Sequence, residues 1–600
     1  MIGSLIERLF YWAVRLPTKI VPWHRLPIGF MSGLAVGGIR YVLREQNLVD
    51  TEELAHADPP LSPNDHSARA ADGSFNDLSY PLMGQAGTRR FARNVPLQYA
   101  YPEDEPAIMQ PSPRTVSLEL LTRHDFIPVP SLNLLAAAWI QFQVHDWFNH
   151  TSTDDNPWEL ELPDDDPWHQ HPMRIKRTAT DPDWSSDEGT PPAYINTSAH
   201  WWAASQIYGS TDERLNQLRS REDGKLIVGQ DGLLPVDPET GVDITGFNEN
   251  WWIGLSLLHT LFTHEHNAIC DGLRSEYPDW NDERIFHHAR LINAALMAKI
   301  HTIEWTPGIL AHPALRIGMS TNWWGLMGKQ FRTRVGRIGN SEILSGILGS
   351  RTDHHSGIYA MTEEFVSVYR MHQLIPDEFS FRSRDNDRVV LQPTLTDVVF
   401  GNSRKRLNEM FEQGMSIEDV FYSFGTSHPG AIVLHNFPKA LQEFRKEDGE
   451  LIDLAAIDVM RDRERGVPRY NMFRELMHMP PVKSFEKLTN NPEWAEEIRS
   501  VYDGDIDRVD ATVGMFAEPF PKGFGFSDTA FRVFVLMASR RLKSDRFFTD
   551  SYTPEVYTPY GMRWINDNTM SDVLIRHYPS LERFVQNVKN PFAPWPKANS

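Results

Sequence analysis

The stretch VSVYRMHQLIPD, residues 366–377, carries most of the information about the fold and chemistry of this chain. It places Tyr369 three residues before His372, about one helical turn away on the same helical face. A histidine can bind haem iron, and a tyrosine at this spacing could give an electron to an oxidised haem. The resulting tyrosyl radical could remove hydrogen from an unactivated C–H bond, which no ordinary acid or base side chain can do. We expect one helix that begins at Thr362, carries both side chains and ends before Pro376.

A second run, AAAWIQFQVHDWFNH at residues 136–150, offers a histidine for the other face of a haem. A helix over about residues 131–150 puts Gln141, His145 and the small Ala138 on one face, where a flat ring could approach. A neutral His145 can take a proton from a bound hydroperoxide and return it to the departing oxygen, while Gln141 hydrogen-bonds the same ligand. Either of the two histidines, taken alone, could equally be an ordinary core residue.

Composition excludes several classes of protein. The chain has 600 residues and a formal net charge of −21, so it is a poor candidate for wrapping nucleic acid. The single Cys270 excludes an internal disulfide framework and any cysteine-based metal site. The histidine clusters at residues 264–266 and 354–355 lack the zinc-binding HExxH spacing. One cysteine is compatible with a reducing compartment, and we expect a cytoplasmic protein.

Three segments follow from the pattern along the chain. Residues 1–48 are apolar and basic, residues 49–115 read as an extended irregular arm rich in Pro, Asp and Ser, and residues 116–600 form the catalytic domain. Apolar residues recur at helical spacing near the N-terminus, namely Ile2, Leu5, Ile6, Leu9, Phe10, Ala13 and Val14. This amphipathic helix could give peripheral contact with a membrane, or it could dock on the body of the protein. No stretch reaches the roughly 18 apolar residues of a spanning helix.

Helical periodicity dominates the second half of the chain, at residues 250–273, 282–305 and 528–548. Short β-like runs, such as residues 225–228, are few. The acidic, Pro-rich stretch at residues 153–192 is expected to be a loop. The pattern therefore predicts one large, mainly α-helical domain with few short strands.

Many ordered motifs resemble those of a known superfamily. They are IVPWHRLP (20–27), FARN (91–94), AAWIQFQVHDW (137–147), WWAASQIYG (201–209), LFTHEHNAICDGL (261–273), ARLINAALMAKIHTIEWT (289–306), NWWGLMGK (322–329), VYRMHQLIPD (368–377), RDRERGVPRYN (461–471), VYDGD (501–505) and MASRRLKSDRFFT (537–549). The chain resembles the animal-type haem peroxidase and cyclooxygenase superfamily, and more closely the fatty acid α-dioxygenases known from plants. The likeness extends over nearly the whole chain.

The resemblance implies a role for each haem-site residue. His372 matches the proximal ligand of heme b, His145 the distal histidine, and Gln141 its hydrogen-bonding neighbour. Tyr369 matches the catalytic tyrosine that becomes a radical.

The resemblance also implies a clamp for a fatty acid carboxylate. The HTIEWT motif supplies His301 and Thr306, and a C-terminal arginine completes the clamp. By position in MASRRL this arginine is Arg541, with Arg540 as the alternative. A guanidinium is the natural partner of a carboxylate, because it can form two parallel hydrogen bonds with it.

One departure concerns calcium. Members of the family bind calcium through the Asp after the distal histidine, here Asp146, and through a Thr-x-Trp-x-Asp-x-Ser loop. Residues 199–205 here have Ala199 and Ala203 where the loop has oxygen-bearing side chains, and keep Ser205. Calcium takes six to eight oxygens, so we expect no tight calcium binding.

The sequence thus predicts a haem-dependent fatty acid α-dioxygenase that uses O2 and produces oxylipins. Two alternatives remain open at this point. One is a haem peroxidase that oxidises small donors with hydrogen peroxide, which has no use for Tyr369 or the clamp. The other is a non-catalytic helical binding protein on a peroxidase fold.

Overall fold

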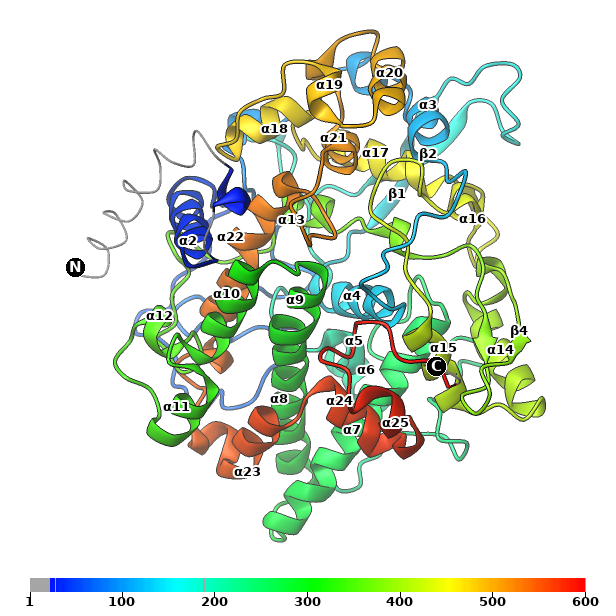
Figure 1. Ribbon diagram of the computed structural model, residues 1–600. Coiled ribbons are helices and arrows are strands. Elements are labelled where there is room, and N and C mark those ends of the chain that lie inside the picture. Colours follow the sequence, from blue (N-terminus) through cyan, green and yellow to red (C-terminus); the bar gives the residue numbers. More distant parts are fainter. Residues whose placement is uncertain (1–21, 27–28, 187–188, 599–600) are drawn as a thin grey trace.

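The computed structural model describes residues 22–26, 29–186 and 189–598 (Figure 1). Helices account for far more of this part of the chain than strands do, and its strands form only two-stranded antiparallel sheets. The prediction of a mainly α-helical fold with few short strands is therefore confirmed. The amphipathic helix predicted over residues 2–14 lies outside the described residues. Within the described ranges, no helix is long and apolar enough to cross a membrane.

The longer helices are α2 (Gly29–Gln46), α4 (Leu135–Trp147), α6 (Asp212–Leu218), α7 (Ile253–Glu276), α8 (Asp282–Ile300), α10 (Pro313–Trp324), α11 (Gly328–Val335), α14 (Gly401–Glu412), α15 (Ile417–Thr426), α17 (Leu454–Glu464), α18 (Tyr470–Leu476), α20 (Pro492–Val501), α21 (Ala511–Ala517), α22 (Asp528–Ser544), α23 (Pro554–Asp567) and α24 (Met570–His577). The shorter ones are α3 (Pro113–Val116), α5 (Ser205–Tyr208), α9 (Thr306–Ile309), α12 (Glu342–Ser345), α13 (Glu363–Val368), α16 (Lys439–Gln442), α19 (Phe485–Leu488) and α25 (Glu582–Val585). The strands are β1 (Ser152–Leu160), β2 (Met173–Thr178), β3 (Phe381–Arg382), β4 (Val389–Leu391), β5 (Phe444–Arg445) and β6 (Leu451–Ile452).

The helices α7 and α8 pack side by side through the middle of the molecule (Figure 1). Helix α7 is buried on every side over its first ten residues, 253–262, as expected of a helix that is apolar all round. Helix α4 packs on α7, and α23 packs on α8. The three helices predicted from periodicity are thus confirmed as α7, α8 and α22, although the end of the second is a π-helical turn, His301–Trp305.

Helix α22 connects distant parts of the chain. It packs against α2 and against α13, and it lies in the upper half of the molecule in Figure 1. All but three of its 17 residues are buried. This placement brings the C-terminal part of the chain next to the helix that leads to Tyr369.

The irregular N-terminal segment is part of the core packing. Between residues 49 and 112 the structure has only turns, bridges and short 3-10 helices at Leu97–Tyr99 and Ala107–Met109. Its Arg93 side chain is 2% exposed and pairs with Glu364 at 2.8 Å. The segment therefore runs along the helical body and is tied to the first turn of α13.

Two local expectations were wrong. The acidic stretch at residues 153–192 is not all loop, because β1 and β2 form an antiparallel hairpin in it. Alternate side chains such as Trp158 and Ile175 enter a small separate apolar cluster, and this burial outweighs the acidic composition. The run 225–228 is not a strand, since it makes only the single bridge from Leu226 to Arg219.

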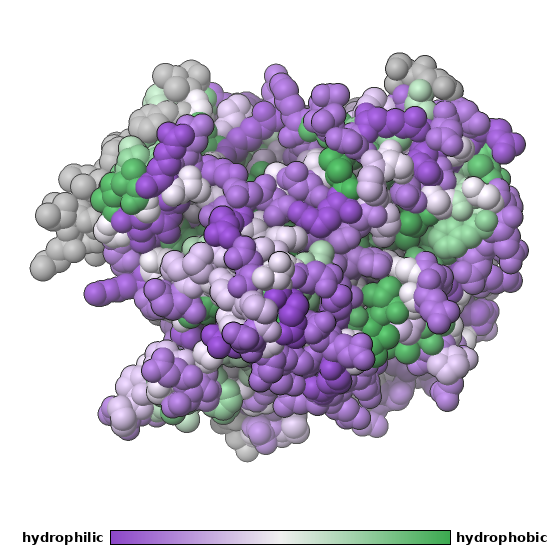
Figure 2. Space-filling view, turned by 90° about the horizontal axis from the view of Figure 1, so that it is seen from below, coloured by the Kyte–Doolittle hydropathy of each residue, from purple (hydrophilic) through white to green (hydrophobic). Residues whose placement is uncertain are grey.

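The face seen from below is mostly hydrophilic, with separate and limited apolar areas (Figure 2).

Candidate active site

Tyr369 and His372 do not share one helix, so the expected continuous helix was wrong. Helix α13 ends at Val368, Tyr369 is its C-terminal cap, and His372 opens a separate 3-10 turn, His372–Leu374. The break follows from side-chain bonds to α17. The Ser367 hydroxyl donates to Asp462 at 2.9 Å, and Arg370 donates to Asp458 at 2.8 Å. These bonds pull the chain out of helical register.

The His372 ring is held by a carboxylate. Its Nδ1 lies 2.8 Å from Asp458 Oδ2, and Asp458 also accepts from Arg370. Burial acts to raise the pKa of the Asp458 carboxyl, but His372 and Arg370 outweigh burial and the pKa is lowered. An ionised Asp458 fixes the tautomer with hydrogen on Nδ1 and leaves Nε2 as the free donor atom. A metal-bound histidine typically has this second partner, which orients the ring and raises its basicity.

The second imidazole of the site is buried on α4. His145 Nδ1 is buried and has no hydrogen-bond partner in the part of the chain that the structure describes, and the ring of Phe247 lies 4.7 Å away. Burial lowers the pKa of His145 to about 3, so this ring is neutral and can accept a proton. Gln141 Nε2 donates to the Asn250 carbonyl at 3.1 Å. One imidazole with a free Nε2 and one neutral imidazole are the donor set that a haem with proximal and distal histidines needs, so these residues fit the group.

Tyr369 lies on a narrow cavity of about 20 Å³. The cavity is lined by Trp147, Trp202, His301, Thr302, Thr306, Met319, Asn322, Phe365, Tyr369, Phe534, Ala538, Arg541 and Leu542. The ring of Trp147 meets the Tyr369 ring edge to face at 5.2 Å. Burial raises the pKa of the Tyr369 phenol, so the hydroxyl keeps its hydrogen at ordinary pH. The structure thus brings Tyr369 together with all three residues of the predicted clamp.

Arg541 brings an unpaired positive charge to this cavity. Its side chain is 1% exposed, and its Nη2 donates to the Trp201 carbonyl at 3.2 Å. Its Nε and Nη1 are buried without a hydrogen-bond partner among the described residues, and the guanidinium lies 4.5 Å from the Trp147 ring and 4.4 Å from the Trp202 ring. An unpaired buried cation is costly, so the unused N–H groups indicate a site for an anion.

Arg540 points elsewhere. It donates to the backbone carbonyls of His354, Gly357 and Ile358, at 2.9 to 3.1 Å. Its charge is therefore used to hold a loop, and it does not line the Tyr369 cavity.

His301 and Thr306 reach the cavity from the end of α8. The Trp139 indole donates to His301 Nδ1 at 3.3 Å, and the His301 ring stacks on Trp305 at 4.8 Å. Burial, reinforced by nearby Arg541, lowers the pKa of His301 well below its usual value. A neutral ring that accepts at Nδ1 must carry its hydrogen on Nε2, so His301 is available as a donor. Thr306 comes directly after the π-helical turn His301–Trp305 and is the first residue of α9.

The loop beside Asp146 has few side-chain oxygen atoms that could bind a metal ion. The Ser205 backbone N–H donates to Asp146 Oδ1 at 2.5 Å, while Asp146 Oδ2 and Ser205 Oγ are buried and find no hydrogen-bond partner within the described ranges. Burial raises the pKa of Asp146 to about 6, against the opposing effects of Arg541 and the Ser205 N–H. Ala199 and Ala203 contribute no side-chain oxygen. No group of three or more His, Cys, Asp or Glu suited to a metal is found among the described residues.

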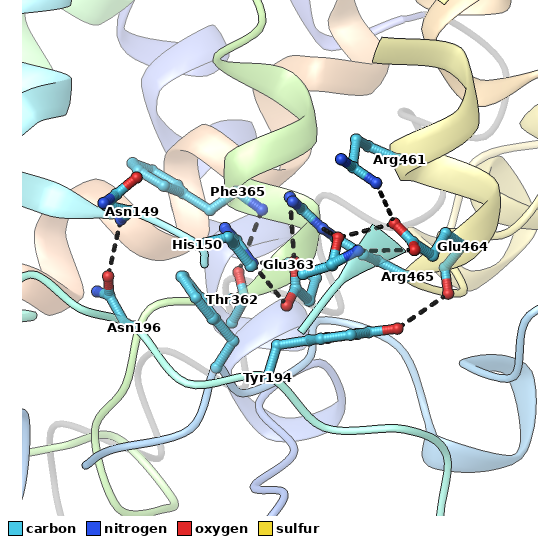
Figure 3. Close-up of polar contacts among 12 residues, drawn as sticks. Asn149, His150, Tyr194, Asn196, Thr362, Glu363, Phe365, Arg461, Glu464 and Arg465 are labelled. Carbon is cyan, nitrogen blue, oxygen red and sulfur yellow. Dashed lines mark hydrogen bonds and ion pairs between the residues drawn. The ribbon is translucent and has the colours of Figure 1, made fainter. Parts of the chain in front are cut away.

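A buried network that the sequence reasoning missed joins the two halves of the site (Figure 3). His150 Nε2, just beyond α4, lies 3.1 Å from both carboxylate oxygens of Glu363, the first residue of α13. The His150 ring stacks on Phe91 at 4.1 Å, and Arg465 lies 4.0 Å from the same carboxylate. This network fixes the helix of His145 relative to the helix that leads to Tyr369. Nothing in a single sequence pairs residues so far apart.

Comparison with known proteins agrees with this geometry. The family described as animal haem peroxidase matches residues 68–589. The alpha-dioxygenase PIOX of Nicotiana tabacum is 38% identical over 99% of this chain and 92% of its own length, and alpha-dioxygenase 1 of Arabidopsis thaliana is 36% identical over 99% and 93%. The chain therefore belongs to the animal haem peroxidase family, in its alpha-dioxygenase branch.

Solved structures give the same relationship. The crystal structure of the Oryza sativa fatty acid alpha-dioxygenase superposes with a TM-score of 0.91 at 34% identity, covering 98% of this chain and 97% of that one. A tyrosine-to-phenylalanine variant of the same protein, solved with palmitic acid, gives the same values. Peroxidase A of Dictyostelium discoideum, at 20% identity and a TM-score of 0.66, shares the fold alone.

Proposed function

We propose that this protein is a haem-dependent fatty acid α-dioxygenase that adds O2 to C2 of a fatty acid. The observation that carries the proposal is the convergence of Tyr369, His301, Thr306 and Arg541 on one cavity. The relatives that match it over nearly the full length are named alpha-dioxygenases.

His372 would hold the iron of a heme b through its free Nε2, and Asp458 would keep the ring in place. When bound, the haem supplies, after reaction with a hydroperoxide, the one-electron oxidation that converts Tyr369 to a phenoxyl radical. His145, as a neutral base, accepts the hydroperoxide proton and returns it to the leaving oxygen. Gln141 hydrogen-bonds the same ligand.

Arg541 binds the fatty acid carboxylate with its unused N–H groups, and His301 and Thr306 donate further hydrogen bonds. This clamp places C2 against Tyr369, and regiochemistry follows from that geometry. The phenoxyl oxygen takes a hydrogen atom from C2, and O2 adds to the carbon radical. The peroxyl radical then takes a hydrogen atom back from the Tyr369 hydroxyl, which yields the 2-hydroperoxy acid and restores the phenoxyl radical.

The cavity is too small for a fatty acid chain as it stands, so the apolar walls must move when substrate enters. Met319, Phe534 and Leu542 are the flexible or bulky side chains that would have to turn.

The decisive experiment is product analysis after incubation of the haem-loaded protein with palmitic acid and O2. A 2-hydroperoxy acid, or the aldehyde one carbon shorter that it forms on losing CO2, is the expected product. Oxidation of small phenolic donors without change in the fatty acid would favour the peroxidase alternative instead.

We place the protein in the cytoplasm, and contact with a membrane through the N-terminal helix stays a prediction.

A further inference from the structure

Exposed apolar side chains gather in one segment of the surface. About half of the exposed large apolar residues in the described ranges fall within residues 317–344. They are Ile317, Leu326, Met327, Val335, Ile338, Ile343 and Leu344, each about half exposed or more. Single exposed apolar residues are ordinary, but a group of them marks a contact surface.

Backbone bonds hold most of these residues together. The Leu326 backbone N–H donates to the Ile343 carbonyl at 2.8 Å, and the Ser345 hydroxyl donates to the Ile338 carbonyl at 2.9 Å. Leu326 and Met327 precede α11, Val335 ends it, and Ile343 and Leu344 lie on α12. We call this set the 326–344 patch: Leu326, Met327, Val335, Ile338, Ile343 and Leu344.

The patch carries positive charge on an acidic protein. Between residues 313 and 345 the sequence has five cations and one acid, although the whole chain has a net charge of −21. The acid, Glu342, is already paired with Arg40 at 3.0 Å. Arg332 and Arg337 bond backbone carbonyls, whereas Arg334 is exposed and Lys329 is exposed with only a long contact of 3.9 Å to the exposed Asp567. Exposed apolar residues among cations are the composition of a surface that binds an anionic lipid interface.

The patch also lies next to the proposed substrate site. Helices α11 and α12 pack on α10 and form the left edge of the molecule in Figure 1. Helix α10 also contributes Met319 and Asn322 to the wall of the Tyr369 cavity. One helix thus separates the apolar, basic surface from the place where C2 of a fatty acid would react.

We propose that the 326–344 patch, with Lys329 and Arg334, docks the protein on an anionic membrane surface, from which it takes up fatty acid. The uptake role rests on the proposed function. Long-chain fatty acids partition strongly into lipid, so an enzyme that stays at the interface meets its substrate there.

The test uses the full-length, haem-loaded protein and sedimentation with vesicles of phosphatidylcholine, with and without phosphatidylglycerol. The parent should bind the vesicles that contain phosphatidylglycerol, and high salt should release it. Lys329→Gln with Arg334→Gln, and separately Leu326→Gln with Ile343→Gln, should each weaken binding about tenfold or more. Matched controls on other surfaces, Arg174→Gln with Arg583→Gln and Ile227→Gln with Met472→Gln, should bind as the parent does.

Several results would overturn the proposal. One is a parent that binds no vesicle, and another is patch variants that bind as well as the controls, which would place the contact elsewhere. A third is a parent that self-associates on sizing while the patch variants do not, with no vesicle binding, which would assign the patch to a second copy of the chain. Oxygenation of a detergent-dispersed fatty acid, measured on the same samples, keeps the two proposals apart, because the docking variants should retain it.

Discussion

The cavity at Tyr369 and the loop at Asp146 adjoin the same helix, α4, but they differ in how many of the expected ligand side chains are present. At the cavity, every residue type that the resemblance requires is present, and the buried Arg541 still has N–H groups without partners. At the loop, alanines stand at two oxygen positions, and the Asp146 carboxyl has one backbone hydrogen bond. An anion site needs little more than one well-placed cation, whereas a calcium site needs six to eight oxygens together. We therefore expect a carboxylate clamp to work with a few residues in place, and a calcium site to fail when some of its oxygen ligands are missing.

The largest effect on activity is expected when the reacting group of the cavity, the Tyr369 hydroxyl, is removed. Tyr369→Phe deletes one hydroxyl and keeps the ring against Trp147, so fold and haem content should hardly change. Fatty acid oxygenation should be abolished, because phenylalanine cannot form a phenoxyl radical. Oxygen uptake with palmitic acid measures it. Turnover near the parental rate would mean that the cavity is not where hydrogen is abstracted.

The haem ligand comes next. His372→Ala should abolish stable haem uptake, because it removes the imidazole that Asp458 orients. The Soret absorbance of the purified variant is the measurement. A Soret band equal to that of the parent would falsify the assignment.

The role of Arg541 in the clamp can be tested by comparison with the adjacent Arg540. Arg541→Leu should raise KM for fatty acids tens-fold or more, since loss of one partner of a buried charge pair costs about 2–5 kcal/mol. Arg540→Leu is the control for position, because Arg540 bonds only loop carbonyls outside the cavity. His301→Ala and Thr306→Val should raise KM for fatty acids less than Arg541→Leu does.

Methyl esters give an independent check of the same charge. The parent should use them poorly, because an ester lacks the anion that Arg541 binds. Equal turnover of acid and ester by the parent, or an unchanged KM in Arg541→Leu, would remove the clamp from the mechanism.

A pH series tests whether His301, in the wall of the cavity, stays neutral. Burial and Arg541 hold the pKa of His301 well below 6.5, so the ring stays neutral as the pH falls from 8 to 6. His301 should therefore cause no change in the KM of a soluble medium-chain fatty acid over this range, and any change caused by Asp146, whose pKa is about 6, should be the same in His301→Gln. If His301 gained a proton there, its charge would strengthen carboxylate binding and lower KM. A fall of severalfold that disappears in His301→Gln would contradict the assignment.

The smallest effect is expected at the loop. Removal of calcium with a chelator should leave activity unchanged, and metal analysis should find no stoichiometric calcium. Ala203→Asp with Ala199→Thr would restore two oxygen side chains and is the matched gain-of-site variant. Activity lost from the parent on chelation and restored by calcium would show that backbone and water oxygens complete the site after all.

Some structure followed from local patterns, because local physics decides it. The apolar periodicity of residues 253–276, 282–300 and 528–544 requires buried helices, and these helices form. The acidic stretch at residues 153–192 shows the limit of such reasoning. Its composition suggests a loop, but Trp158 and Ile175 find apolar partners that are distant in sequence.

The sequence by itself determined which residue types are available for the predicted site, because Tyr369, His372 and Arg541 are each identified by their position in an ordered motif. The tertiary structure alone decided how these residues are placed. It breaks the helix between Tyr369 and His372, since carboxylates on α17 bond that segment. It separates Arg541 from Arg540, since consecutive helical residues face different neighbours. It also joins His150 to Glu363, 213 residues apart. These contacts depend on the distances between segments far apart in the chain, which no local pattern contains.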